Sequence, residues 1–102
     1  MNDKFLSFLG ICKKANKLGI GLEISKARKD QAHLFIVAVD SADNTKEVVS
    51  TLIQDTNIPQ LIKYTKLELG TSIGERETGV ISVLDSLMAK NLISLSQLSK
   101  GE

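Results

Sequence analysis

The feature that most constrains this chain is its alternation of short apolar runs with segments of helical periodicity. The runs are LFIVAV at 34–39, QLIKY at 60–64 and VISVL at 80–84, and all three are short for helices. LFIVAV is apolar throughout, which predicts a strand buried on both faces of a sheet. Strands alternating with helices predict one sheet covered by helices on both sides. The sequence therefore predicts an α/β protein, specifically a three-layer α/β/α sandwich.

The first and last helices are predicted from apolar residues that recur on one face. Residues 3–14 place Phe5, Leu9 and Cys12 at positions i, i+4 and i+7. Asp85 follows the third apolar run, where its carboxylate is a suitable helix N-cap. The helix after it carries one apolar face, formed by Met88, Leu92 and Leu95. A short helix is also expected at 22–30, and a further strand is possible near 18–20.

Two capping boxes predict the starts of two more helices. In each, a side chain that accepts a backbone hydrogen bond is followed three residues later by a glutamate. The pairs are Asn44 with Glu47 and Thr65 with Glu68. Gly74 is expected to end the second of these helices, because glycine tolerates the left-handed backbone found after many helix ends.

Composition and cysteine content limit the class of protein. The chain has 102 residues, which is enough for a single domain spanning 1–102, and 42% of them are hydrophobic. With one cysteine it forms no internal disulfide, which fits a reducing compartment. The N-terminal segment lacks the apolar core of a signal peptide, and no run approaches the length of a membrane span. We therefore expect a cytoplasmic protein that does not bind membranes. A monomer is expected as well, although no sequence pattern addresses the oligomeric state.

Charge is distributed unevenly along the chain although the formal net charge is only +1. Residues 1–30 hold seven Lys and Arg against three acids, whereas residues 31–102 hold six against nine. A basic segment of this kind can form a local anion-binding face on a protein that is nearly neutral overall. A solvated helix face would show the same pattern, so charge alone does not decide between these two interpretations.

The segment KLGIGLEISKARK, residues 17–29, is the strongest candidate for a binding site. Gly19 and Gly21 allow positive φ angles and close approach of a phosphate at the start of a helix. Basic residues flank this turn and would attract phosphates; they are Lys17, Lys26, Arg28 and Lys29. Glu23 among these bases is a candidate acceptor for the edge of a guanine. Alternatively, it is a first-turn acid paired with Lys26.

Catalytic and metal-binding interpretations are less well supported. Cys12 and His33 are a nucleophile and a base by type, but no third group orients them, and Cys12 lies on an apolar helix face. Asp40 and Asp85 each follow a predicted strand, as Mg²⁺ ligands do in some α/β proteins. With Asp43, they are equally suited to turns and helix caps. We expect no catalytic residue, no metal and no cofactor.

Several segments together resemble a known family. These are FLGICKKANKLGIGLEISKA, VAVDSADNTKE and LELGTSIGERETGVISVLDSLMAKNLISL, which extend over about residues 5–95. In this order and spacing they resemble the bacterial YlxQ branch of the L-seven-Ae ribosomal protein family. The resemblance implies an α/β/α sandwich around a small, mixed, four-stranded sheet. It also implies binding of kink-turn RNA, a bent duplex with sheared G·A pairs, by a turn carrying Gly-x-Asn-Glu-x-x-Lys.

The resemblance assigns roles to particular positions. Glu23 matches the glutamate that reads guanines and Lys26 the lysine that holds the backbone. Leu22 stands at the asparagine position and cannot hydrogen-bond a base, and the family glycine lies one position before Gly21. Two further groups complete the implied site. The basic lead-in is Lys14 and Lys17, and the second loop is Gly74, Glu75, Arg76, Glu77, Thr78 and Gly79.

The sequence thus predicts a non-catalytic RNA-binding protein of ribosomes or translation, with kink-turn or similarly bent RNA as its partner. Ribosomal or other proteins are expected as further partners in such a ribonucleoprotein. Leu22 and the two carboxylates of the second loop motivate an alternative. In that alternative the chain keeps the fold as a protein-interaction module whose RNA affinity is weak or lost.

Overall fold

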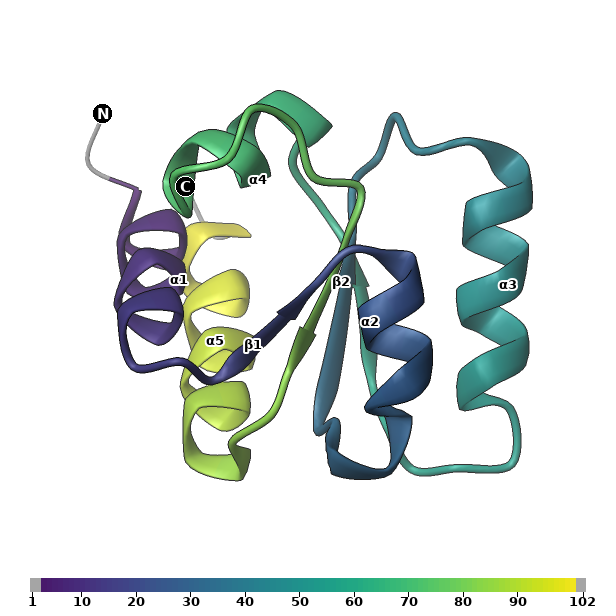
Figure 1. Cartoon of the computed structure of the whole chain (residues 1–102). Coiled ribbons are helices and arrows are strands. Elements are labelled where there is room, and N and C mark those ends of the chain that lie inside the picture. The colour runs from purple at the N-terminus through teal and green to yellow at the C-terminus, as the bar shows by residue number, and fades with distance from the viewer. Residues whose placement is uncertain (1–2, 101–102) are drawn as a thin grey trace.

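A computed structural model describes residues 3–100 of the chain, and the side chains of residues 3–97. Its centre is a mixed four-stranded sheet in the order β1-β4-β2-β3 (Figure 1). β4 is antiparallel to both of its neighbours, and β2 is parallel to β3. The strands are β1 (Leu18–Ile20), β2 (Leu34–Val37), β3 (Gln60–Ile62) and β4 (Val80–Val83). The three predicted strands are therefore confirmed, although β2 and β3 each end two residues earlier than the apolar runs, and β1 is the strand considered possible near 18–20.

Helices cover both faces of this sheet, as predicted for an α/β/α sandwich (Figure 1). One layer holds α1 (Lys4–Lys14), α4 (Lys66–Ser72) and α5 (Ser86–Lys100). The opposite layer holds α2 (Leu22–Ala27) and α3 (Asp43–Ile53). The short helix expected at 22–30 is divided, because α2 ends at Ala27 and a separate 3₁₀ turn, Lys29–Gln31, follows it. Within residues 3–100, no helix combines the length and apolarity needed to cross a membrane.

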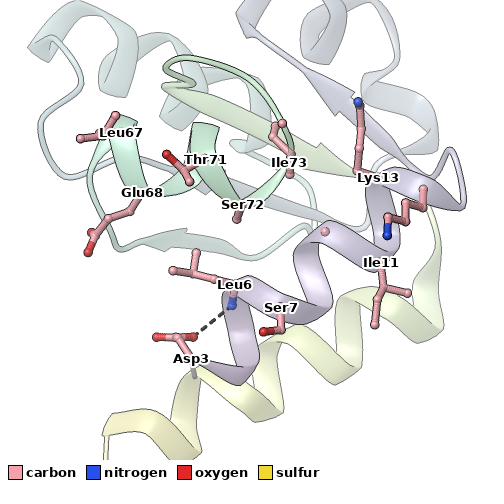
Figure 2. A pocket seen from close by; sticks show the side chains of 13 residues that line it. Asp3, Leu6, Ser7, Ile11, Lys13, Leu67, Glu68, Thr71, Ser72 and Ile73 are labelled. Carbon is pink, nitrogen blue, oxygen red and sulfur yellow. Dashed lines mark hydrogen bonds between the residues drawn. The ribbon is translucent and has the colours of Figure 1, made fainter. Parts of the chain in front are cut away.

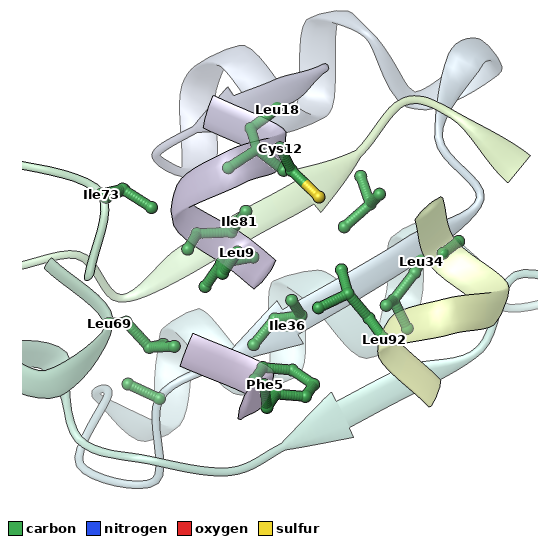
Figure 3. Packing of buried hydrophobic residues seen from close by; sticks show 13 residues of the cluster. Phe5, Leu9, Cys12, Leu18, Leu34, Ile36, Leu69, Ile73, Ile81 and Leu92 are labelled. Carbon is green, nitrogen blue, oxygen red and sulfur yellow. The ribbon is translucent and has the colours of Figure 1, made fainter. Parts of the chain in front are cut away.

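The run LFIVAV is apolar throughout because β2 contributes to two cores. Successive side chains of a strand point to opposite faces of the sheet. Leu34 and Ile36 pack with α1, α4 and α5 in the larger cluster, which Figure 3 shows. Phe35 and Val37 pack with Val49 of α3 in the smaller cluster. This division explains why residues 34–37 include no polar residue, and it ties both helix layers to one central strand; Val39, at the end of the run, lies beyond β2 and is 46% exposed.

Most predicted helix boundaries are confirmed by their hydrogen bonds. Thr65 and Glu68 form a complete capping box at the start of α4. Gly74 follows the end of α4 at φ +80°, where Glu75 N donates to Gly70 O at 2.8 Å. Such a bond closes many helices that end in a left-handed glycine. Asp85 caps α5, because its Oδ2 accepts from Met88 N at 2.9 Å.

The capping box predicted for Asn44 and Glu47 is wrong. The helix begins earlier, at Asp43, and Ala42 is its N-cap without a side-chain hydrogen bond. Ala42 O already accepts from Lys46 N at 3.1 Å. Asn44 is therefore a helical residue of the first turn, where its side chain does not occupy the N-cap position.

Candidate nucleic-acid interface

Three loops that are distant in sequence meet at one end of the sheet. The antiparallel register places the ends of β1 and β2 beside the start of β4. Gly21 N donates to Val80 O at 2.9 Å, and Ala38 N donates to Gly79 O at 2.9 Å. We call this region the loop end; it comprises the turn into α2 with the loops 38–42 and 74–79. In Figure 1 the two loops lie at the top and the turn into α2 lies below them. The register thus unites the two segments that the sequence singled out.

Gly21 has the backbone conformation expected of a glycine at this turn. Its φ and ψ angles are +96° and 158°, in a region that only glycine adopts readily. A Cβ there would meet no atom within 4 Å, so conformation, rather than space, requires the glycine. The turn at the start of α2 is consequently open to its surroundings, as the sequence predicted.

Gly19 has a different role from the one predicted. It lies buried within β1, and its φ angle is not positive. A Cβ at this position would overlap the hydroxyl of Ser82 on β4. The hydroxyls of Ser25 and Ser82 both donate to Gly19 O at 3.3 Å. Gly19 therefore allows α2 to pack closely on the sheet, and no phosphate can reach it there.

Helix α2 separates one core residue from two exposed charged residues. Leu22 is half-buried and packs against the smaller core cluster, so its side chain supports the fold. Glu23 and Lys26 are exposed. Residues three apart lie on the same helix face, so a carboxylate and an ammonium are presented together beside the open turn. The carboxylate accepts hydrogen bonds, and the ammonium attracts phosphate.

The loop 74–79 folds back on α4 and presents charged side chains. Glu75, Arg76 and Glu77 are exposed, whereas Thr78 is only 4% exposed and its N donates to Lys66 O at 3.0 Å. The carbonyl of the next residue, Gly79, accepts two hydrogen bonds, from Ala38 N at 2.9 Å and from Ser41 Oγ at 3.1 Å. Hydrogen bonds thus attach the loop 74–79 to α4 and to the loop 38–42, while the charged side chains at its tip remain exposed.

Two lysines that the sequence reasoning missed also lie at the loop end. Lys46 Nζ donates to Val39 O at 2.8 Å, and Lys66 N donates to Asp40 Oδ1 at 2.8 Å. The side chain of Lys66 lies about 4 Å from the position of a Cβ on Gly79. Lys46 and Lys66 both belong to residues 31–102, the part of the sequence in which acids outnumber bases. No local pattern marks them, because only the strand register brings them to this end.

The basic residues of the N-terminal segment do not form one face. Lys17 precedes β1, and its carbonyl accepts from Leu84 N at the end of the sheet opposite the loop end. Lys14 lies in the last turn of α1. Arg28 Nη2 donates to Gln31 Oε1 at 2.9 Å, beyond the far end of α2. The structure therefore separates these bases: Lys26 lies in the last turn of α2, one turn beyond Glu23, and Lys17 lies at the opposite end of the sheet. Lys14 lines a groove with Gly74 in the helix layer opposite α2.

The weaker sequence candidates have structural roles. Asp40 lies at the loop end and Asp85 at the opposite end of the sheet, because β2 and β4 are antiparallel. They do not form a shared Mg²⁺ site, and the described residues contain no cluster of three metal-ligating side chains. Cys12 is fully buried, whereas His33 is exposed. Burial raises the pKa of the Cys12 thiol from 9.0 to about 11, and the charge of Asp85 acts in the same direction.

The raised pKa of Cys12 predicts a loss of stability in alkali. Between pH 9.0 and about 11 the unfolded chain releases the thiol proton while the folded protein retains it. The free energy of unfolding should fall by up to about 1.4 kcal/mol per pH unit in that window. Denaturant titrations of the parent and of Cys12→Ala at several pH values measure this effect. Parallel pH profiles for the two proteins would contradict it.

Comparison with known proteins identifies structural neighbours. No protein-family model and no curated protein sequence matches the chain. A protein of unknown function from Bacillus halodurans C is similar, with a TM-score of 0.88, 29% identity and coverage of 92% of this chain and 97% of that one. The 15.5 kD RNA binding protein of Giardia lamblia is also similar, with a TM-score of 0.73, 18% identity and coverage of 98% and 92%. The chain therefore shares its fold, over nearly its whole length, with an RNA-binding protein.

Proposed function

We propose that the protein binds structured RNA at the loop end of the sheet, with kink-turn or similarly bent RNA as the target. The observation that carries the proposal is the hydrogen bond from Gly21 N to Val80 O. It places the turn before Glu23 next to the loop 74–79. The resemblance seen in the sequence requires these same two segments to contact RNA together. The shared fold with the 15.5 kD RNA binding protein of Giardia lamblia adds support.

The charges at the loop end suggest how the RNA would be held. Glu23 would accept hydrogen bonds from guanine edges, and Lys26 would contact the backbone beside them. Lys46 and Lys66 would add phosphate contacts from the other side of the open turn. The side chain of Asp40 is engaged by Lys66 N, so this acid is already part of the fold. A-form RNA is held largely through shape and phosphate contacts, which suits a few well-placed cations.

The test is a binding titration with a labelled kink-turn RNA and with a plain duplex of matched length. Both RNAs are measured across a salt series, with and without Mg²⁺. We expect tighter binding of the kink-turn RNA and a linear fall of log affinity with log salt concentration. Equal, weak binding of both RNAs would contradict kink-turn recognition.

A protein-interaction role is the second candidate, and two observations favour it. Leu22 replaces a base-reading residue and packs on the core instead. Glu75 and Glu77 are exposed in the second loop, where they would repel phosphates. If neither RNA binds measurably at low salt, the loop end is better assigned to a protein partner. The ribosome is a suitable place to look for such a partner.

Lys46 and Lys66 provide a further prediction. Each Lys→Ala substitution should weaken binding to both RNAs and lower the slope of log affinity against log salt by about 1, as expected for one lost phosphate contact. Lys90→Ala is the matched control, because Lys90 is exposed on α5 outside the loop end. The same slope for Lys46→Ala, Lys66→Ala and the control would show that these lysines do not contact RNA.

A further inference from the structure

A groove lies between α1 and α4, and small residues form its floor (Figure 2). Gly10 of α1 faces Ser72 of α4 so closely that a Cβ on Gly10 would lie 2.8 Å from Ser72 O. Ser7 and Thr71 line the groove on either side of this contact. The missing side chain of Gly10 therefore lets α1 and α4 pack closely against each other, and the small residues along their contact form the floor of the groove.

The walls of the groove expose large apolar side chains. Leu67 of α4 is 61% exposed and Ile11 of α1 is 54% exposed. Leu6 lies between them, packed against the larger core cluster on its inner side. Apolar side chains from two neighbouring helices thus border one concave surface. Exposed apolar patches bordered by charged residues are typical of interaction sites.

Opposite charges occupy the two ends of this groove. Asp3 and Glu68 lie at the end where α1 and α4 begin, and Lys13 and Lys14 lie where α1 ends (Figure 2). Both acids are held in place. Asp3 accepts from Leu6 N at 3.0 Å and from Tyr64 Oη at 2.8 Å. Glu68 Oε1 accepts from Thr65 N at 2.9 Å.

We propose that this groove binds an amphipathic helix of a protein partner. The apolar stripe of that helix would lie between Leu67 and Ile11. Its acidic end would face Lys13 and Lys14, and its basic end would face Asp3 and Glu68. Charge complementarity defines this occupant, since a helix of that polarity matches both ends at once. RNA does not fit, because carboxylates and exposed leucine border one half of the groove.

The groove reaches Gly74, the first residue of the loop 74–79. A helix held there would lie beside the proposed RNA site without covering Glu23 or Lys26, which belong to the opposite helix layer. The groove shares only Lys14 and Gly74 with the implied RNA site, and its apolar contacts at Leu67 and Ile11 lie outside that site. A protein and an RNA would therefore be able to bind this fold together.

The test is selection of helical peptides from a displayed library against the full-length protein, followed by titration of the selected synthetic peptides. We expect the selected peptides to carry an apolar stripe, with acidic residues at one end of the helix and basic residues at the other. Binding should fall about tenfold or more for Leu67→Lys and remain unchanged for Leu87→Lys. Leu87 is a matched control, because it is 73% exposed on α5. Circular dichroism and RNA binding should be the same for both variants.

Charge reversal provides the second part of the test. The double variant Lys13→Glu, Lys14→Glu should bind the selected peptides weakly and should bind peptides whose acidic end has been made basic. Three results would overturn the proposal. In the first, the selected peptides bind Leu67→Lys as tightly as they bind the parent. In the second, the affinity of the peptides is unchanged by the charge reversal at Lys13 and Lys14. Alternatively, sedimentation shows that a second copy of the chain covers the groove, with Leu67→Lys abolishing self-association.

Discussion

Exchanging Gly70 for valine is expected to lower the free energy of unfolding by about 3 kcal/mol and to displace the loop 74–79. Gly70 is buried in α4, and a Cβ there would lie 2.8 Å from both Arg76 O and Glu77 Cα. These are backbone atoms, so no side-chain rotation can relieve the overlap. The loop must therefore move away from α4, or the helix must move away from the core.

Denaturant unfolding of Gly70→Val measures the loss of stability, and Thr71→Val is its control. Thr71 is the next residue of the same helix and is exposed, so valine there leaves helix propensity nearly unchanged and does not create the overlap. RNA affinity, measured where both variants remain folded, should fall only for Gly70→Val if the loop contacts RNA. Equal unfolding midpoints for the two variants would show that the loop does not depend on Gly70.

Lys26→Ala and Glu23→Ala are expected to affect RNA binding in different ways. Without the ammonium of Lys26, affinity for the kink-turn RNA and for the plain duplex should fall together, because a phosphate contact carries no sequence information. Without the carboxylate of Glu23, the preference for the kink-turn RNA should shrink by about 1–3 kcal/mol, the usual value of a good base contact. Affinity for the plain duplex should change little.

Two exposed residues outside the loop end provide controls for this pair. Asp30→Ala removes a carboxylate from the 3₁₀ turn that follows α2, and Lys90→Ala removes an ammonium from α5. Both controls should bind the two RNAs like the parent. If Lys26→Ala and Glu23→Ala also bind like the parent, the loop end is not the RNA site. RNA binding by another surface would then have to be sought.

Local sequence patterns determined the elements of this fold. The run LFIVAV predicted a strand with two buried faces, and β2 has both. Thr65 with Glu68, Gly74 and Asp85 predicted helix boundaries that the hydrogen bonds confirm. Predictions from such patterns are correct because a helix cap or an apolar periodicity depends only on residues that are close together in the sequence. The same locality explains the error at Asn44, where the helix starts two residues earlier than the pattern implied.

Tertiary structure alone decided which charged and polar residues lie together. Gly21 was recognisable from its neighbours, but the burial of Gly19 depends on Ser82, a residue on another strand. The seven bases of residues 1–30 suggested one basic face, yet Lys17 lies before β1 and Lys26 lies on α2, whereas Lys46 and Lys66 reach the loop end. The antiparallel pairing of β4 with β1 and β2 determines which of these charged residues lie at the same end of the sheet. Strand register is set by contacts between distant residues, so no count of charges along the chain reveals it.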